Sequence, residues 1–140
     1  MIADLLETGS IPVLERLVQF TGARHRLITN NIANLSTPYY RPQDLDPDSF
    51  QVALGDAIAH RRRTGGELAL SDTRQLHFRS DGIDARPQSM DSNILFHDQN
   101  NRNLERIMQH LAENTLAHNA AIEFLKSEFD LLKTAIRERL

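Results

Sequence analysis

Apolar residues recur at alternating steps of four and three along the C-terminal third of the chain. Eight of the ten positions in this series are apolar, and the spacing averages 3.5 residues. This spacing, sustained over more than four heptads, is typical of a coiled-coil seam. It predicts one long helix over residues 101–138. The seam positions are Leu104, Met108, Leu111, Thr115, His118, Ile122, Leu125, Phe129, Leu132 and Ile136.

The same spacing occurs near the N-terminus and predicts a second helix over residues 12–35. Ser10 and Pro12 suit the first turn of a helix. Pro38 disfavours the α conformation at Thr37, so the helix has to end shortly before that point. The seam positions of this helix are Leu14, Val18, Thr21, His25, Ile28, Ile32 and Leu35.

The middle of the chain, residues 36–100, lacks such a pattern. Asp46-Pro47-Asp48-Ser49 is a strong helix start, and it predicts a short helix at about 48–63. From Gly65 onward the residues are mostly polar, and "RSDGIDARPQSMDSN" is typical of a linker. The predicted fold is therefore all-α: a single domain, 1–140, in which two terminal helices form an antiparallel coiled-coil hairpin around an irregular or disordered middle segment.

Each seam is interrupted once by polar side chains, and these interruptions predict the register of the hairpin. Aligning them places Thr21 opposite His118 and His25 opposite Thr115. All other layers are then apolar on both sides. A slip of one heptad would set Thr or His against apolar residues in several layers, at roughly 1–3 kcal/mol for each unpaired buried polar group. The alternative is that both polar layers face solvent or a neighbouring subunit and that the match is chance. The stripes are also wider than one partner helix can cover.

Composition and charge narrow the function classes. The net charge is −3, which gives no electrostatic argument for nucleic acid as a partner. The chain has no cysteine, which excludes disulfides and thiol chemistry. Asp4 and Glu7 occupy positions where a cleaved signal peptide carries Lys or Arg, so export by that route is not expected. No apolar run approaches the length of a membrane span.

The titratable residues form no recognisable catalytic or metal-binding pattern. The six histidines include no HExxH pair, so we expect no metal, no cofactor and no small-molecule substrate. Asp44, Asp46 and Asp48 have the spacing that begins a calcium loop, but Pro47 argues against one and favours helix capping. The run at 61–63 (Arg-Arg-Arg) is interpreted as a solvated helix end. The chain is not expected to be an enzyme.

Two segments carry a family resemblance. Asn31-Ile32-Ala33-Asn34, two further residues and Thr37-Pro38-Tyr39-Tyr40 resemble a signature of the bacterial flagellar axial proteins, usually Asn-Ile-Ala-Asn, two residues, then Thr-Pro-Gly-Tyr. Residues 111–136, "LAENTLAHNAAIEFLKSEFDLLKTAI", resemble the closing helix of the B-type flagellar rod proteins. The matching motif residues, which the resemblance assigns to assembly, are Asn31, Ile32, Ala33, Asn34, Thr37, Pro38 and Tyr40.

The resemblance implies a structural protein rather than a binding adaptor. It implies a subunit of the proximal rod of the flagellar basal body, a periplasm-crossing drive shaft for motility, which self-assembles through its terminal helices. It also implies export through the flagellar type III apparatus without a cleaved signal peptide. The implied partners are the chain itself, other rod subunits, the export apparatus and the membrane ring base. Asn31 and Asn34 would then bond to other subunits. The alternative is a cytosolic helical adaptor or chaperone that binds a client helix.

Two residues depart from the family pattern. Tyr39 replaces a glycine, and because tyrosine resists positive φ we predict a type I turn or an extended segment with negative φ there. Tyr39 and Tyr40 would then point to opposite sides, one against a helix and one toward a neighbour. His118 replaces a tyrosine, which places a titratable ring in the predicted seam.

Overall fold

The computed structural model describes residues 9–90 and 104–138 of the chain. Most of these residues are helical, as predicted, but two small antiparallel sheets are also present. In chain order the elements are α2 (Ile11–Ala33), β1 (Gln43–Asp44), α3 (Pro47–Thr64), β2 (Leu76–Phe78), β3 (Ile83–Ala85), β4 (Gln88–Ser89) and α4 (Leu104–Arg137).

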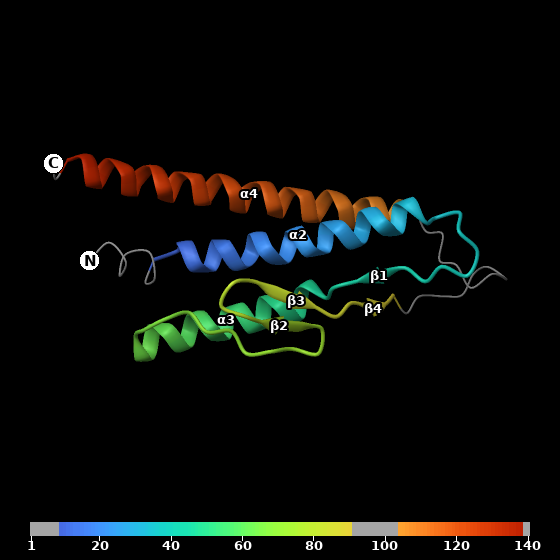
Figure 1. The fold of residues 1–140 in the computed structure, drawn as a ribbon, viewed down its shortest axis with the longest axis horizontal. Helices are drawn as coiled ribbons and strands as arrows, with labels where there is room; N and C mark the ends of the chain where they lie inside the picture. Colours follow the sequence, from blue (N-terminus) through green and yellow to red (C-terminus); the bar gives the residue numbers. More distant parts are fainter. Residues whose placement is uncertain (1–8, 91–103, 139–140) are drawn as a thin grey trace.

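Helix α2 lies in the middle of the molecule and has neighbours on two sides (Figure 1). Helix α4 runs antiparallel to α2 along one side, and α3 lies with the β2–β3 hairpin on the other. The architecture is therefore a three-layer arrangement around α2. At one end of the molecule α4 continues past the first residue of α2.

The buried core lies between α2 and the middle segment. It consists of Phe20 from α2, Leu45, Phe50 from α3 and Leu76 from β2. The rings of Phe20 and Phe50 stack with centroids 4.2 Å apart and an interplanar angle of 1°. Because aromatic side chains bury large apolar areas, this stack fixes α3 against α2.

The middle segment contains two short strand pairs, so the prediction of an irregular region is wrong where these strands lie, mainly at residues 76–89, whereas residues 65–75 have no helix or strand. Strands β2 and β3 pair antiparallel, with Leu76 opposite Ala85, and β1 pairs antiparallel with β4. The Arg16 guanidinium donates to the carbonyls of Arg79 and Gly82, at 2.6 and 2.9 Å, and ties the hairpin turn to α2. Strands of two or three residues are too short for alternation to stand out in the sequence. Residues 91–100 of the predicted linker lie outside the described residues.

The predicted helices are present with small shifts at their ends. The first was predicted at 12–35 and spans Ile11–Ala33, and the short helix predicted at about 48–63 spans Pro47–Thr64. The last was predicted at 101–138 and spans Leu104–Arg137 within the described residues. Positions 101–103 lie outside them. None of the helices in the described ranges combines the length and the apolar character needed to cross a membrane.

Asp46 caps α3, as the sequence predicts. Its carboxylate accepts hydrogen bonds from the backbone N–H groups of Asp48 and Ser49, and from the Ser49 hydroxyl. The bond from the Ser49 hydroxyl is the main cause that lowers the pKa of Asp46 below its ordinary value, although partial burial opposes it. The cap leaves Asp44 free for a separate ion pair with α2.

Candidate functional site

The asparagine cluster at the end of α2 bonds within the chain. Asn31 is buried, and its amide nitrogen donates to the Gln43 carbonyl at 2.7 Å. Its amide oxygen accepts from the Gln43 N–H and from the Tyr40 hydroxyl, both at 3.0 Å. The expectation that Asn31 bonds to another subunit is therefore wrong. This asparagine fastens β1 to α2, which offsets its low helix propensity.

The other motif residues surround this bond network. The Asn30 amide donates to the Tyr40 hydroxyl, and the Asn34 amide donates to the Asn30 carbonyl at 2.9 Å. Burial raises the pKa of the Tyr40 phenol, and the bond from Asn30 opposes that shift. The phenol therefore stays protonated and donates to Asn31. Ile32 is half-buried, whereas Ala33, Thr37 and Pro38 are exposed.

Tyr39 adopts φ = 60°, so the predicted negative φ is wrong. The Tyr40 N–H donates to the Thr37 carbonyl across a turn that has Pro38 at its second position and Tyr39 at its third. This is the geometry of a type II turn, which ordinarily takes glycine at the third position. The chain keeps the turn in spite of the side chain. One ring lies against a helix as predicted, since the Tyr40 hydroxyl bonds to Asn31 of α2, and Tyr39 is 76% exposed.

A polar node joins α2 to α4. The Thr21 hydroxyl lies 2.7 Å from Nδ1 of His118, which confirms the predicted Thr21–His118 pair. The buried amide of Asn114 donates to the Thr21 carbonyl at 2.9 Å. His25, in contrast, is exposed, so Asn114 and not the predicted His25–Thr115 layer supplies the second polar contact. The node fixes the antiparallel register of the two helices.

A second polar cluster, absent from the sequence-based predictions, joins α2, β1 and α4. The Arg24 guanidinium makes a bidentate contact with the Asp44 carboxylate, at 2.9 and 2.8 Å, and both side chains are largely buried. Nδ1 of His110 lies 3.6 Å from the same carboxylate. Twenty residues separate Arg24 from Asp44, so no local spacing signals this pair.

The buried face of each helix is rotated slightly from the predicted seam. On α4 the fully buried residues are Ile107, Asn114 and Ala121, each one position before a predicted seam residue. On α2 the predicted seam residues Thr21 and Ile28 are buried, but Arg24 and Asn31 are buried as well, one position before His25 and Ile32. The seam positions that remain exposed are His25, Leu104, Met108, Phe129 and Ile136. The half-buried ones are Leu14, Val18, Ile32, Leu35, Leu111, Thr115, His118, Ile122, Leu125 and Leu132.

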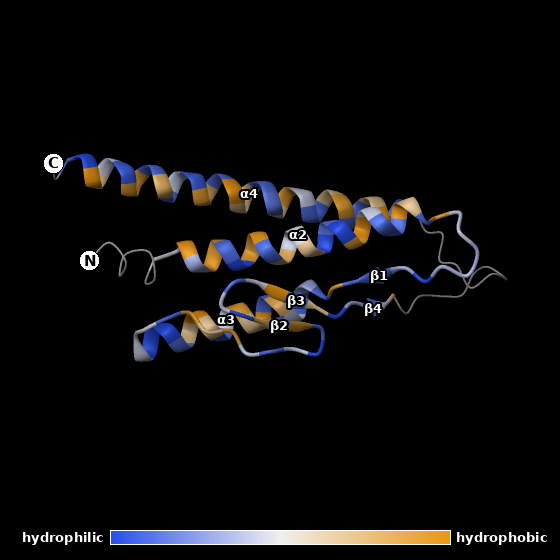
Figure 2. Cartoon of the chain, viewed as in Figure 1, coloured by the Kyte–Doolittle hydropathy of each residue, from blue (hydrophilic) through white to orange (hydrophobic). Residues whose placement is uncertain are grey.

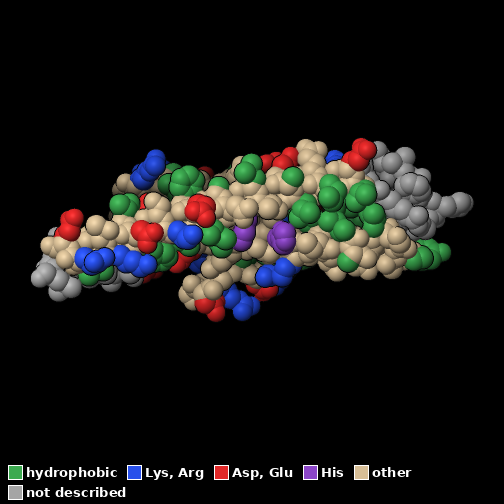
Figure 3. Space-filling model, turned by 90° about the horizontal axis from the view of Figure 1, so that it is seen from above, with side chains coloured by type: hydrophobic (Ala, Val, Ile, Leu, Met, Phe, Trp, Pro, Cys, Tyr) green, Lys and Arg blue, Asp and Glu red, His purple; other side chains and the backbone are tan. Residues whose placement is uncertain are grey.

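Helix α4 carries most of the exposed apolar surface of the described residues. Leu116, Phe124 and Leu131 are 74, 64 and 64% exposed. Apolar bands continue along α4 where it passes the start of α2 (Figure 2). In the view from above, hydrophobic side chains gather toward the end where α4 begins (Figure 3). Such exposure is typical of an interaction surface.

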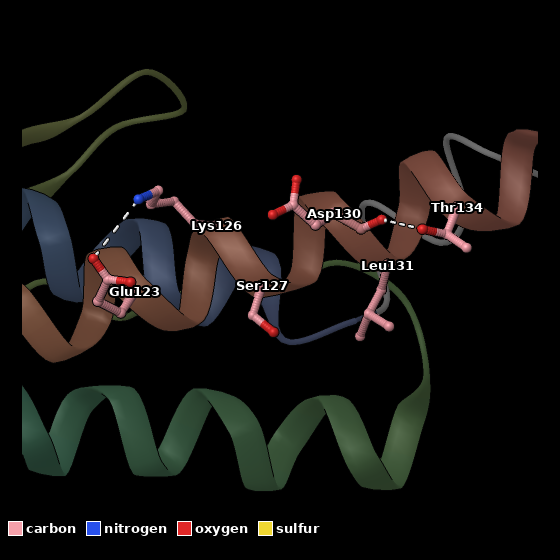
Figure 4. Close-up of a pocket in the computed structure, with 6 residues that line it drawn as sticks. All are labelled: Glu123, Lys126, Ser127, Asp130, Leu131 and Thr134. Carbon is pink, nitrogen blue, oxygen red and sulfur yellow. Dashed lines mark hydrogen bonds and ion pairs between the residues drawn. The ribbon is translucent and has the colours of Figure 1, made fainter.

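A shallow groove of about 400 Å³ lies on the C-terminal half of α4 (Figure 4). Leu131 supplies an apolar wall, and hydroxyl and charged groups supply the rest. Lys126 pairs with Glu123 at 3.8 Å, and Lys133 pairs with Asp130 at 3.5 Å. These exposed pairs contribute little to stability. The lining residues are Glu123, Lys126, Ser127, Asp130, Leu131 and Thr134.

Within the ranges 9–90 and 104–138, no cluster of His, Asp or Glu side chains has the arrangement of a metal site. The polar groups described above instead join elements of the chain to one another. The fold and this surface define a class: mainly helical proteins whose longest helix exposes apolar side chains within the described part of the chain.

Comparison with known proteins specifies the family within this class. The chain is 30% identical to the flagellar basal body rod protein FlgB of Bacillus subtilis over 133 residues, which is 94% of this chain and 95% of the relative. It is 29% identical to the protein of that name from Cereibacter sphaeroides, over 81% of this chain and 83% of the relative. It is 22% identical to the protein of that name from Aquifex aeolicus, over 92% of this chain and 94% of the relative. No family model matches the chain. The chain belongs to the FlgB family of flagellar basal body rod proteins.

Proposed function

We propose that this chain is a structural subunit of the proximal rod of the flagellar basal body. Membership of the rod protein family supports the proposal, and the observation that carries it structurally is the uncovered apolar face of α4. A folded chain that exposes Leu116, Phe124 and Leu131 on one helix requires a partner to remove them from water.

In this proposal α2 and α4 form an antiparallel coiled-coil pair through which copies of the chain and other rod subunits assemble. The polar node at Thr21 sets the register of the pair. The proposal extends to the export apparatus and the membrane ring base as further partners, and to a periplasmic rod reached by type III export. The motif residues around the turn after α2 contribute indirectly, because they fasten β1 to the C-terminal end of α2.

The test is complementation of a strain that lacks this gene. Phe124→Glu introduces a charge on the outer face of α4, where it cannot disturb the core. We expect a folded protein that no longer copurifies with basal bodies and no longer restores swimming. Val52→Glu is the matched control, because Val52 is equally exposed but lies on α3.

Two results would contradict the proposal. If the wild-type chain stays in the cytosolic fraction and is absent from detergent-extracted basal bodies, the adaptor alternative is favoured. If Phe124→Glu assembles and swims as the wild type does, the outer face of α4 is not the assembly surface.

A further inference from the structure

Helix α4 is longer than the helix that packs along it. The Thr21 hydroxyl lies 2.7 Å from Nδ1 of His118, and this contact sets the antiparallel register. Ten residues before Thr21 is Ile11, the first residue of α2. Ten residues after His118 is Glu128. The last nine residues of α4, 129–137, therefore extend about 13 Å past the start of α2 (Figure 1). We call this part of α4 the extension.

The side of α4 that faces α2 keeps its apolar character on the extension. The buried and half-buried residues on this side include Ala121, Leu125 and Glu128, at steps of four and three. The next step of four reaches Leu132, which is half-buried and lies past the start of α2. Ile136, one turn further, is apolar and 41% exposed. The interface between the two helices therefore continues along the extension, where no residue of α2 lies opposite it.

The residues that precede α2 have the position and the length to cover the extension. Residues 1–8, MIADLLET, lie outside the described residues, and two further residues separate them from α2. They are therefore tethered at the point where the extension begins. Eight residues span about 12 Å as a helix and more when extended, which compares with about 13 Å for the extension. Ile2, Leu5 and Leu6 supply apolar side chains at helical spacing.

The backbone at the start of α2 directs this segment toward the extension. Ser10 has the helical angles φ −76° and ψ −18°, and its carbonyl accepts the Leu14 N–H at 3.0 Å. Its side chain makes no cap hydrogen bond, unlike that of Asp46 at the start of α3. The chain therefore enters α2 along the helix axis, and because α2 and α4 are antiparallel, that axis runs beside the extension (Figure 1). Gly9 allows the segment to turn its apolar side toward α4.

The charges of the two segments are complementary. Asp4 and Glu7 give the segment before α2 acidic side chains without a basic one. On the extension, Lys133 and Arg137 outnumber Asp130. Exposed pairs add little stability, but opposite charges favour this segment over one of like charge.

We propose that residues 1–8 pack against the extension of α4 in the same chain. Leu5 and Leu6 contact Leu132, and the contact continues the α2–α4 interface to the end of α4. It leaves Phe124 exposed, because Phe124 precedes the extension, so that side chain stays available to the partner in the proposed function. The contact belongs to the single chain and does not depend on that function.

Disulfide trapping tests the contact, because the chain has no cysteine of its own. Leu5→Cys and Leu6→Cys are each combined with Leu132→Cys, and the purified chain is oxidised mildly at low concentration. We expect at least one pair to give a monomer with an internal disulfide. Leu116→Cys in place of Leu132→Cys is the matched control. It should leave the thiols free, because sixteen residues of helix place it about 24 Å from Leu132.

Two outcomes of this experiment would overturn the proposal. Thiols that stay reduced in both pairs would show that the segment lies elsewhere. Disulfide-linked dimers in place of monomers would show that the segment packs on a second copy of the chain.

Amide exchange gives a readout that needs no disulfide. Leu5→Asp with Leu6→Asp should speed exchange at residues 130–137 by at least about fivefold and leave 114–118 unchanged, because only the extension loses its cover. Val52→Asp adds a charge at an exposed site on α3 and is the matched control, which should leave both segments unchanged. Wild-type exchange at 130–137 in the double variant would contradict the proposal.

The outcomes separate this inference from the proposed function. An internal disulfide in a chain that is absent from basal bodies supports this inference and refutes the function. A chain that assembles into basal bodies but forms neither internal disulfide refutes this inference alone.

Discussion

Helices α2 and α4 share one sequence pattern and have different surroundings. Both carry wide apolar stripes, but α2 is covered by α4 on one side and by α3 with the β2–β3 hairpin on the other. Within the described residues, helix α4 contacts α2 and, at His110, β1, and it leaves Leu116, Phe124 and Leu131 exposed. The wide apolar stripe is therefore completed inside the chain for α2, whereas under the proposed function another subunit completes it for α4.

The largest effect expected from this comparison concerns two phenylalanines. Phe20 on α2 is buried and stacked, so Phe20→Ala should lower the free energy of unfolding by about 3–5 kcal/mol. Phe124 on α4 is 64% exposed, so Phe124→Ala should change it by less than about 0.5 kcal/mol. Urea unfolding of the isolated protein measures both. Equal losses would mean that α4 is also covered on both sides in the free chain.

The next largest effect concerns the buried ion pair between Arg24 of α2 and Asp44 of β1. Asp44→Ala leaves the Arg24 guanidinium buried without its carboxylate and should cost about 3 kcal/mol. Asp48→Ala, an exposed site in the first turn of α3, should cost far less. The same urea experiment compares them. A negligible loss in Asp44→Ala would show that water reaches Arg24.

The polar node between the two helices gives a smaller effect. Asn114→Ala removes the donor to the Thr21 carbonyl and should cost about 1–2 kcal/mol. Asn119→Ala on the exposed side of α4 is the matched control and should be neutral.

The register of α2 against α4 is tested by a double variant, Ile28→Cys with Leu111→Cys. Each site lies seven residues from the Thr21–His118 contact, so the two thiols should form a disulfide on mild oxidation. A bridge from Ile28→Cys to His118→Cys instead would show a shifted register.

The three helices and the packing of α2 against α4 could be predicted from the sequence. Apolar spacing placed α2 and α4, and the start signal at Asp46 placed α3, each within a few residues of the observed ends. The polar interruptions placed Thr21 opposite His118. Hydropathy failed where polar side chains are buried. Arg24, Asn31 and Asn114 are buried because each has a hydrogen-bond partner elsewhere in the chain. A pattern of apolar residues in the sequence does not reveal such partners.

The β2–β3 hairpin, which packs on the side of α2 away from α4, could not be predicted for a related reason. Each strand of the middle segment has two or three residues, so its alternation is too brief to separate from chance. The turn at Tyr39 shows the opposite failure. Residue preference argued against positive φ, but Pro38 and the bonds of Tyr40 to Asn30 and Asn31 hold the glycine-type turn.

The smallest effect concerns the cap of α3, the helix that covers the second side of α2. Asp46 has a folded-state pKa below its ordinary value of 3.8, so its charge stabilises the fold above that pH. The stabilisation is lost as the pH falls through the lowered pKa. Asp46→Asn keeps a good N-cap but removes the charge, so it should cost about 0.5 kcal/mol at pH 7.

The difference between Asp46→Asn and the wild type should therefore shrink below about pH 4 and disappear at lower pH, once Asp46 is protonated in the folded protein. Asp56→Asn, an exposed site in the middle of α3, is the matched control for loss of one negative charge. Amide exchange localises the effect. Faster exchange in residues 47–50 with unchanged exchange at 114–118 is expected, because the cap supports only the side of α2 away from α4. Faster exchange in both segments would show that α3 and α4, which pack on the two sides of α2, unfold as one unit.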